Sequence, residues 1–249
     1  MSLTSTNSNR INFDEIFKKT RINMFGNLIL WPILLIGISG WTLVSGKASN
    51  LGMTVAAWIA LGAGSLSFLI YIYTQSTLPD KQGYNVPPGN VIFRFIIRMI
   101  EVISVSYIGV PALCKLLENL FGFTITLPSP YNWLGLVLLA PGLGFGIWTM
   151  YTYASRGKGT TVPYEPTQQL ITEGPYRYLR NPMVLATHFI MAGLVVILSS
   201  YILLFIVLSA IKESHKYIVR VEENEMEIRF GQAYLDYKTR VPRWIPWKR

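Results

Sequence analysis

Two short stretches near the C-terminal end hold residue types that can bind a charged ligand. The first, Gly174–Met183, reads GPYRYLRNPM, and the second contains Arg220–Glu223, Met226, Phe230-Gly231, Tyr234 and Tyr237. An arginine offers a planar fork that suits a carboxylate, and a tyrosine face can hold a cation such as a sulfonium. A glutamate at the head of an apolar and aromatic helical stripe is placed to face inward, toward an ammonium, ribose hydroxyls or Arg180.

Taken alone, each stretch also has an ordinary structural interpretation. Tyrosines beside Arg177 and Arg180 are typical of the interfacial belt at the end of a membrane helix, and the pair Glu222 and Glu223 is typical of a solvated cytosolic helix. The intervening segment Pro182–Ile211 is almost wholly apolar. If it crosses a membrane once, the two stretches lie on opposite faces. If it folds back, they meet on one face and build a polar pocket.

The intervening segment favours the second arrangement. It is too long for a single crossing without strong tilt, and Ser199-Ser200 interrupts it near the middle. We therefore predict a helical hairpin with arms at Met183–Leu198 and Tyr201–Val219. The first arm is short for a full crossing, so a hairpin that enters the membrane only partway is the alternative.

The composition is typical of an integral membrane protein. Hydrophobic residues make up 51% of the chain and charged residues only 14%, with a mean hydropathy of +0.36, whereas about a quarter of a soluble domain is charged. We predict an all-α, polytopic membrane helical bundle of about five to six spans, including the C-terminal hairpin, and a cytosolic amphipathic helix. The four earlier spans are expected at Asn27–Val44, Met53–Tyr73, Val91–Leu117 and Tyr131–Tyr153.

The basic residues favour six spans over five. With six, nearly all of them lie on one side, which the positive-inside rule assigns to the cytoplasm together with both termini. With five, the basic residues of the tail would lie outside, namely Lys212, Lys216, Arg220, Arg229, Lys238, Arg240, Arg243, Lys248 and Arg249.

Several classes of function lack a matching pattern in the sequence. The net charge is +9, but no nucleic-acid-binding motif is present, and basic residues beside apolar spans are better explained by contact with anionic lipid. Cys114 is the one cysteine, so an intrachain disulfide is excluded. With two histidines besides, no metal-ligand spacing occurs. The sequence also lacks the Gly-x-Ser-x-Gly pattern of a nucleophile elbow.

Three weaker features each have two interpretations. Gly142 and Gly146 have small-xxx-small spacing, which favours close helix packing, while admission of a cofactor is the alternative. His188 is either a core histidine or a pocket wall. The glycine-rich loop from Arg156 to Pro163 is more typical of a connector than of an anion-binding loop.

The two stretches and the hairpin together resemble the isoprenylcysteine carboxyl methyltransferase and phospholipid methyltransferase superfamily. The matching residues are GPYRYLRNPM and then the pattern EExxMxxxFGxxYxxY, and the upstream GKGTTVP is similar to bacterial members. The resemblance covers about Tyr131 to Pro242. Arg180 and Pro182 match the family directly, as do Glu222 and Glu223, whereas Asn181 stands where many members have histidine. Val184 and Ala186 replace a tyrosine and a glycine of the family motif.

The resemblance implies an integral membrane methyltransferase that uses S-adenosyl-L-methionine at the cytosolic face. The expected acceptor is lipid-borne or hydrophobic, either the carboxylate of a prenylcysteine-like substrate or a phospholipid amine. Arg180 and Glu223 are expected to be catalytic, and no metal is expected. The residues expected to bind the cofactor are Gly174, Pro175, Tyr176, Tyr178, Arg180, Asn181, Pro182, Glu222 and Glu223.

The predicted spans, the charge pattern and the resemblance together define three regions and a location. Residues 1–26 are expected to be a polar cytosolic segment, residues 27–130 to be membrane helices of unassigned role, and residues 131–249 to be the methyltransferase-like core. The bacterial plasma (inner) membrane is the expected location, and the bilayer and a lipid-linked substrate are the expected partners, with no nucleic acid. The alternatives are an NADPH-dependent membrane enzyme similar to sterol reductases and a non-catalytic accessory protein on the same scaffold.

Overall fold

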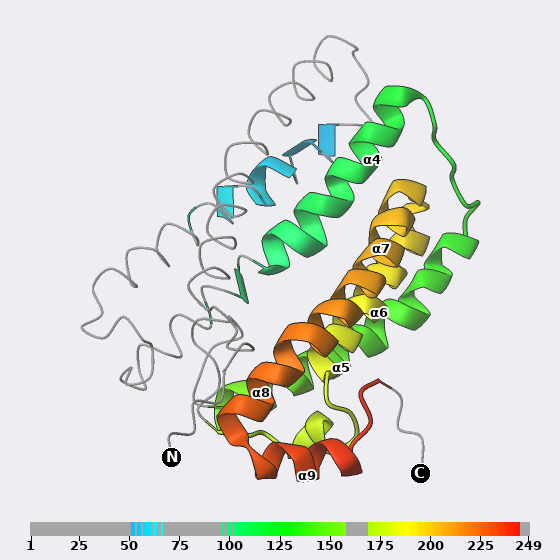
Figure 1. The fold of residues 1–249 in the computed structure, drawn as a ribbon. Helices are drawn as coiled ribbons and strands as arrows, with labels where there is room; N and C mark the ends of the chain where they lie inside the picture. The colour runs from blue at the N-terminus through cyan, green and yellow to red at the C-terminus, as the bar shows by residue number, and fades with distance from the viewer. Residues whose placement is uncertain are drawn as a thin grey trace, which may run out of the picture.

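The computed structural model describes residues 102–157 and 169–244, together with scattered positions between 51 and 100 (Figure 1). The predicted segment 1–26, the span Asn27–Val44 and most of Met53–Tyr73 lie outside the described residues, as does the loop 158–168. All regular elements in the described part of the chain are helical. The predicted all-α fold is therefore confirmed there, and the domain boundaries stay a prediction.

The bundle consists of α4 (Val110–Phe121), α5 (Leu136–Arg156), α6 (Pro182–Leu198) and α7 (Tyr201–Tyr217). Short π or 3₁₀ turns precede or join these helices, namely η2 (Ile103–Gly109), η3 (Tyr131–Gly135) and η4 (Gly174–Arg177). The described end of the predicted span Val91–Leu117 is helical and continues to Phe121.

One helix in the described residues is long and apolar enough to cross a membrane, and it runs from Tyr131 to Arg156 through η3 and α5. Most of its surface is exposed, including Val137, Ile147 and Tyr151, as expected for a helix in contact with lipid. It includes the predicted span Tyr131–Tyr153. Helix α6 is apolar but only 17 residues long, or about 25 Å, so the count of five to six spans stays a prediction.

The predicted hairpin is confirmed as helices α6 and α7. Ser199 ends α6 in the left-handed region at φ 50°, and the Ser200 side chain caps α7 by accepting from the Leu203 N–H. The fully buried Glu118 of α4 stabilises this tip. Its Oε1 accepts from the Ser200 hydroxyl at 2.7 Å and from the Ile202 N–H at 2.9 Å. The tip is therefore tied to a neighbouring helix.

Helices α5 and α6 pack with their backbones close together. A Cβ at Gly142 would lie 2.9 Å from the Ile190 N, and one at Gly146 would lie 3.5 Å from the Ala186 Cβ. At Gly193, the Leu139 N would be 2.7 Å from an added Cβ. The predicted packing role of the small residues is thus confirmed, and it holds the start of α6 beside α5.

Helix α7 continues without a break through the π turn η5 (Ile218–Glu222) into α8 (Glu223–Phe230). The predicted second arm, Tyr201–Val219, therefore corresponds to α7 and the start of η5, and the helix continues beyond it. Gly231, at φ 52°, ends α8, and α9 (Gln232–Arg240) follows. Figure 1 shows α8 and α9 at the end of the bundle where η4 lies, so both polar stretches share one end.

Candidate ligand-binding site

The two stretches meet in an ion pair between Arg180 and Glu223. The Arg180 Nη1 donates to the Glu223 Oε1 at 2.8 Å, and the two side chains are 9% and 4% exposed. This contact exists because α6 and α7 return the chain to the end where it entered. The predicted fold-back, on which the pocket depended, is confirmed.

Both carboxylate oxygens of Glu223 are already occupied. The Arg243 Nε and Nη2 donate to Oε1 at 2.6 Å and to Oε2 at 3.0 Å, and the Lys238 Nζ lies 3.0 Å from Oε2. Burial alone would raise the pKa of Glu223, but the hydrogen bonds from Arg243 and Lys238 and the charge of Arg180 lower it. Glu223 is therefore ionised and engaged by protein groups.

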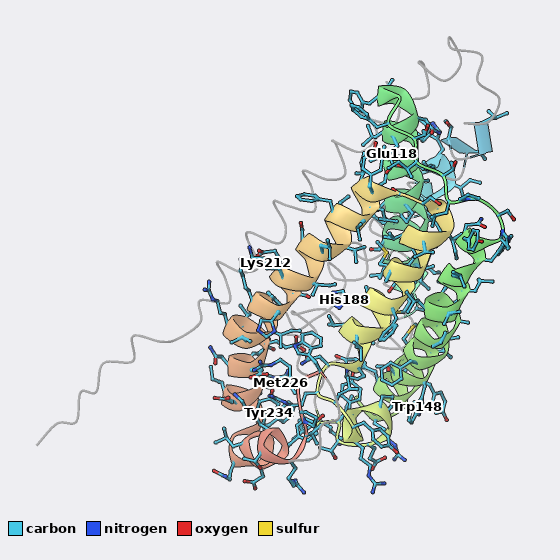
Figure 2. The ribbon with its side chains drawn as sticks, turned by 90° about the vertical axis from the view of Figure 1, so that its right-hand side faces the viewer. Glu118, Trp148, His188, Lys212, Met226 and Tyr234 are labelled. Carbon is cyan, nitrogen blue, oxygen red and sulfur yellow. The ribbon has the colours of Figure 1, made fainter. Side chains whose placement is uncertain are left out.

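A cavity of about 270 Å³ lies beside this ion pair, between the ends of α5, α6, α7 and α8. Figure 2 shows Met226 and Tyr234 of its wall at the end of the bundle opposite to Glu118. The cavity is lined by Tyr153, Leu170, Ile171, Tyr176, Arg180, Asn181, Met183, Val184, Tyr217, Glu222, Glu223, Glu225, Met226, Arg229, Tyr234 and Tyr237. Its wall thus combines tyrosines and apolar groups with charges of both signs.

Two buried donors in this wall have no partner among the described residues, namely the Arg180 Nε and the Asn181 Nδ2. Asn181 is 7% exposed and precedes α6, but its side chain makes no capping hydrogen bond. A buried donor without an acceptor is costly. The two neighbouring donors therefore suit an acceptor group on a ligand, and a carboxylate supplies two such oxygens.

The acidic part of the wall contains Glu222 and Glu225. Burial, together with the negative charges of Glu225 and Glu223, raises the pKa of Glu222 to about 7. Glu225 is within 3.4 Å of the Arg229 Nη1, whereas within the described ranges no ion pair forms at Glu222. Glu222 is consequently the carboxylate in this cavity that suits a cationic ligand group.

Five of the nine expected cofactor-binding residues line the cavity, and four do not. The five are Tyr176, Arg180, Asn181, Glu222 and Glu223. Gly174, at φ 57°, packs so tightly on Thr152 that a Cβ would lie 2.6 Å from the Thr152 Oγ1.

The other three residues outside the wall have structural surroundings. The Pro175 carbonyl accepts from the Tyr178 and Leu179 N–H groups. Tyr178 is half exposed and contacts the Trp148 ring, and Pro182 begins α6. Together with Gly174, these residues shape the turn that presents Arg180.

His188 does not belong to the wall. Its Nε2 lies 3.3 Å from the Ser214 Oγ, and its ring contacts Trp244. Sequence reasoning missed Tyr153, Tyr217, Glu225 and Arg229 in the wall, and it treated Lys238 and Arg243 only as basic tail residues. Glu225 and Arg229 carried a weak signal, since Glu225 is three residues from Glu222 and Arg229 is four residues from Glu225, a spacing that places all three on one helix face.

The comparisons with known proteins agree with this geometry. Residues 131–233 match the family model of phospholipid methyltransferase, and no curated protein matches the chain. The matched range begins at η3, spans the hairpin and contains Arg180, Asn181, Glu222 and Glu223. It covers less than half of the 249 residues. Residues 131–233 are thus similar to the phospholipid methyltransferase family, which belongs to the same superfamily as the isoprenylcysteine carboxyl methyltransferases.

Proposed function

We propose that the protein is an integral membrane methyltransferase that uses S-adenosyl-L-methionine and acts on a lipid-borne or hydrophobic acceptor. Proteins of the phospholipid methyltransferase family generally use this cofactor. The observation that carries the proposal is one cavity with two donors that lack a partner among the described residues, the Arg180 Nε and the Asn181 Nδ2. The same cavity contains the Glu222 carboxylate, which forms no ion pair with any described residue.

The residues present fit the charged groups of the cofactor. Its amino-acid portion carries a carboxylate, which suits the donors of Arg180 and Asn181, and an ammonium, which suits Glu222. The tyrosine faces of the wall suit a sulfonium. When bound, the cofactor supplies an electrophilic methyl group. The chain would bind and orient it and exclude water from the acceptor.

The acceptor would reach the cavity from the hairpin side, where Met183 and Val184 of α6 form part of the wall. A prenylcysteine-like carboxylate needs no base, whereas an amine must lose a proton. Glu223, with its lowered pKa and three cationic partners, is poorly suited to accept that proton. Burial raises the pKa of Glu225, which makes it better suited than Glu223.

The same proposal places the protein in the bacterial plasma membrane with both termini in the cytoplasm. The apolar helix Tyr131–Arg156 and the exposed basic residues Arg156 and Arg177, at the end of the bundle that holds the cavity, support this orientation. Cysteine labelling at the two termini in sealed vesicles tests it.

Calorimetry of the full chain in detergent with S-adenosylhomocysteine tests the cofactor without knowledge of the acceptor. We expect saturable binding by the wild type. We expect about a 10- to 100-fold weakening in Arg180→Ala, the range for loss of a charged hydrogen bond. Arg177→Ala is the matched control because Arg177 is exposed and lies outside the cavity wall.

The rival functions give different results in the same assay. Thermal stabilisation by NADPH, without stabilisation by S-adenosylhomocysteine, would indicate a reductase. If neither compound binds, the proposed function is refuted in favour of the accessory protein.

A further inference from the structure

The chain after α9 returns to the cavity and is fastened there. The Arg180 N–H donates to the Pro242 carbonyl at 2.9 Å. The Tyr237 hydroxyl donates to the Tyr176 carbonyl at 2.7 Å. The Trp244 Nε1 donates to the His215 Nδ1 at 3.2 Å. Residues 241–244 are thereby held against both the turn that carries Arg180 and helix α7.

This fastening brings the Arg243 guanidinium onto Glu223. The Arg243 Nε and Nη2 donate to the two Glu223 carboxylate oxygens, and the Lys238 Nζ also contacts Oε2. Glu223 then accepts from the Arg180 Nη1 at 2.8 Å. Because Nη1 is held in this way, the Arg180 side chain has a defined orientation, in which its buried Nε has no partner within the described part of the chain.

The charges of this cluster also matter for an anionic ligand group. Arg180, Lys238 and Arg243 contribute three positive charges, and Glu223 and Glu227 contribute two negative charges, which leaves one net positive charge. Without Arg243 the cluster would be neutral. Arg243 therefore supports both the orientation of Arg180 and the positive charge beside the cavity.

We propose that Arg243 is a positioning residue, which acts through Glu223 to hold Arg180 for the carboxylate of the bound cofactor. Arg243 lies beyond the matched range 131–233, so the site extends past the family domain into the C-terminal segment. The inference rests on the proposed function. In the proposed arrangement, Glu223 orients Arg180, and Glu222 is the member of the acidic pair that contacts the ammonium of the ligand.

The test compares two ligands that differ only in the carboxylate, S-adenosylmethionine and decarboxylated S-adenosylmethionine. Calorimetry is done on the full chain for the wild type and for Arg243→Ala, Arg243→Lys and Arg240→Ala. Arg240 is the matched control because it is exposed on α9 and, among the described residues, its side chain donates only to the Asp236 carbonyl.

We expect Arg243→Ala to weaken S-adenosylmethionine binding by about 10- to 100-fold and to leave the decarboxylated compound within about threefold of wild type. Arg243→Lys keeps the charge but not the fork, so its loss should be intermediate. If Arg243→Ala does not fold, binding by Arg243→Lys tests the inference instead. Arg240→Ala should bind both compounds like the wild type.

The outcomes separate this inference from the proposed function. Equal weakening of both compounds in the Arg243 variants would mean that Arg243 has a general structural role, and it would overturn the inference while the cofactor assignment stands. Unchanged binding of S-adenosylmethionine in both Arg243 variants would also overturn the inference and leave the cofactor assignment standing. A wild type that binds neither compound would overturn the proposed function, and the inference with it.

Discussion

Replacing Glu222 by glutamine should make the protein more stable at alkaline pH and weaken its binding of S-adenosylhomocysteine. Burial raises the pKa of Glu222 from its ordinary value of 4.5 to about 7, with further contributions from Glu225 and Glu223. At about 1.4 kcal/mol per pKa unit, this difference corresponds to about 3 kcal/mol. The folded protein therefore holds an ionised carboxylate at an energetic cost, as functional sites often do.

The sign of the pH effect follows from linkage. Because the folded-state pKa is the higher one, the folded protein binds the proton more tightly, and this contribution to stability is fully present below pH 4.5. It is lost as the pH rises through about 7, where the folded protein must ionise Glu222. The glutamine side chain in the Glu222→Gln variant does not titrate. The stability of this variant relative to wild type should thus be about 3 kcal/mol more favourable at pH 8 than at pH 4.

The assay measures unfolding of both proteins in detergent at pH 4 and pH 8, and S-adenosylhomocysteine binding at pH 8. We expect the variant to gain stability relative to wild type between the two pH values and to bind about 10- to 100-fold more weakly. Glu213→Gln is the control, because Glu213 is exposed and pairs with Lys216 away from the cavity. A Glu222 variant that loses stability at pH 8 and binds like wild type would refute the reasoning.

Three further substitutions test other parts of the structure. Gly193→Ala should destabilise the protein by about 1–3 kcal/mol, because the new Cβ would lie 2.7 Å from the Leu139 N. Gly144→Ala is the control and should not be destabilising, because a Cβ there would have no atom within 4 Å. Thermal unfolding compares the two variants. Glu118→Gln should cost about 1–3 kcal/mol in thermal unfolding without changing S-adenosylhomocysteine affinity, because Glu118 lies at the opposite end of the bundle (Figure 2); a changed affinity would contradict this. Asn181→Ala should weaken S-adenosylhomocysteine binding about tenfold in calorimetry with little loss of stability, since the Asn181 side chain does not cap α6.

Much of the fold could be predicted because local patterns specify it. Ser199 and Ser200 interrupt an apolar run and form the hairpin turn, with Ser200 as the helix cap. Gly231 adopts a positive φ and separates α8 from α9. Gly142 permits close packing of α5 on α6. These features depend on the conformational range or size of one residue, so the amino-acid sequence is sufficient to indicate them.

The roles within the acidic pair could not be predicted in the same way. Adjacent residues on a helix point about 100° apart, and η5 departs from ordinary helical spacing just before Glu223. The structure shows Glu223 enclosed by Arg180, Lys238 and Arg243, and Glu222 in the cavity wall without an ion pair among the described residues. Which glutamate meets a ligand is therefore decided by how the helices end and pack.

The sequence by itself determined that an arginine, an asparagine and two glutamates flank an apolar hairpin, because residue types and helical periodicity are local properties. Only the tertiary structure decided which donors lack a partner among the described residues, and that Arg243, far from Arg180 along the chain, donates to the same Glu223 carboxylate. The physical reason is that burial and ion pairing depend on distances across the whole bundle, which no spacing within one helix specifies.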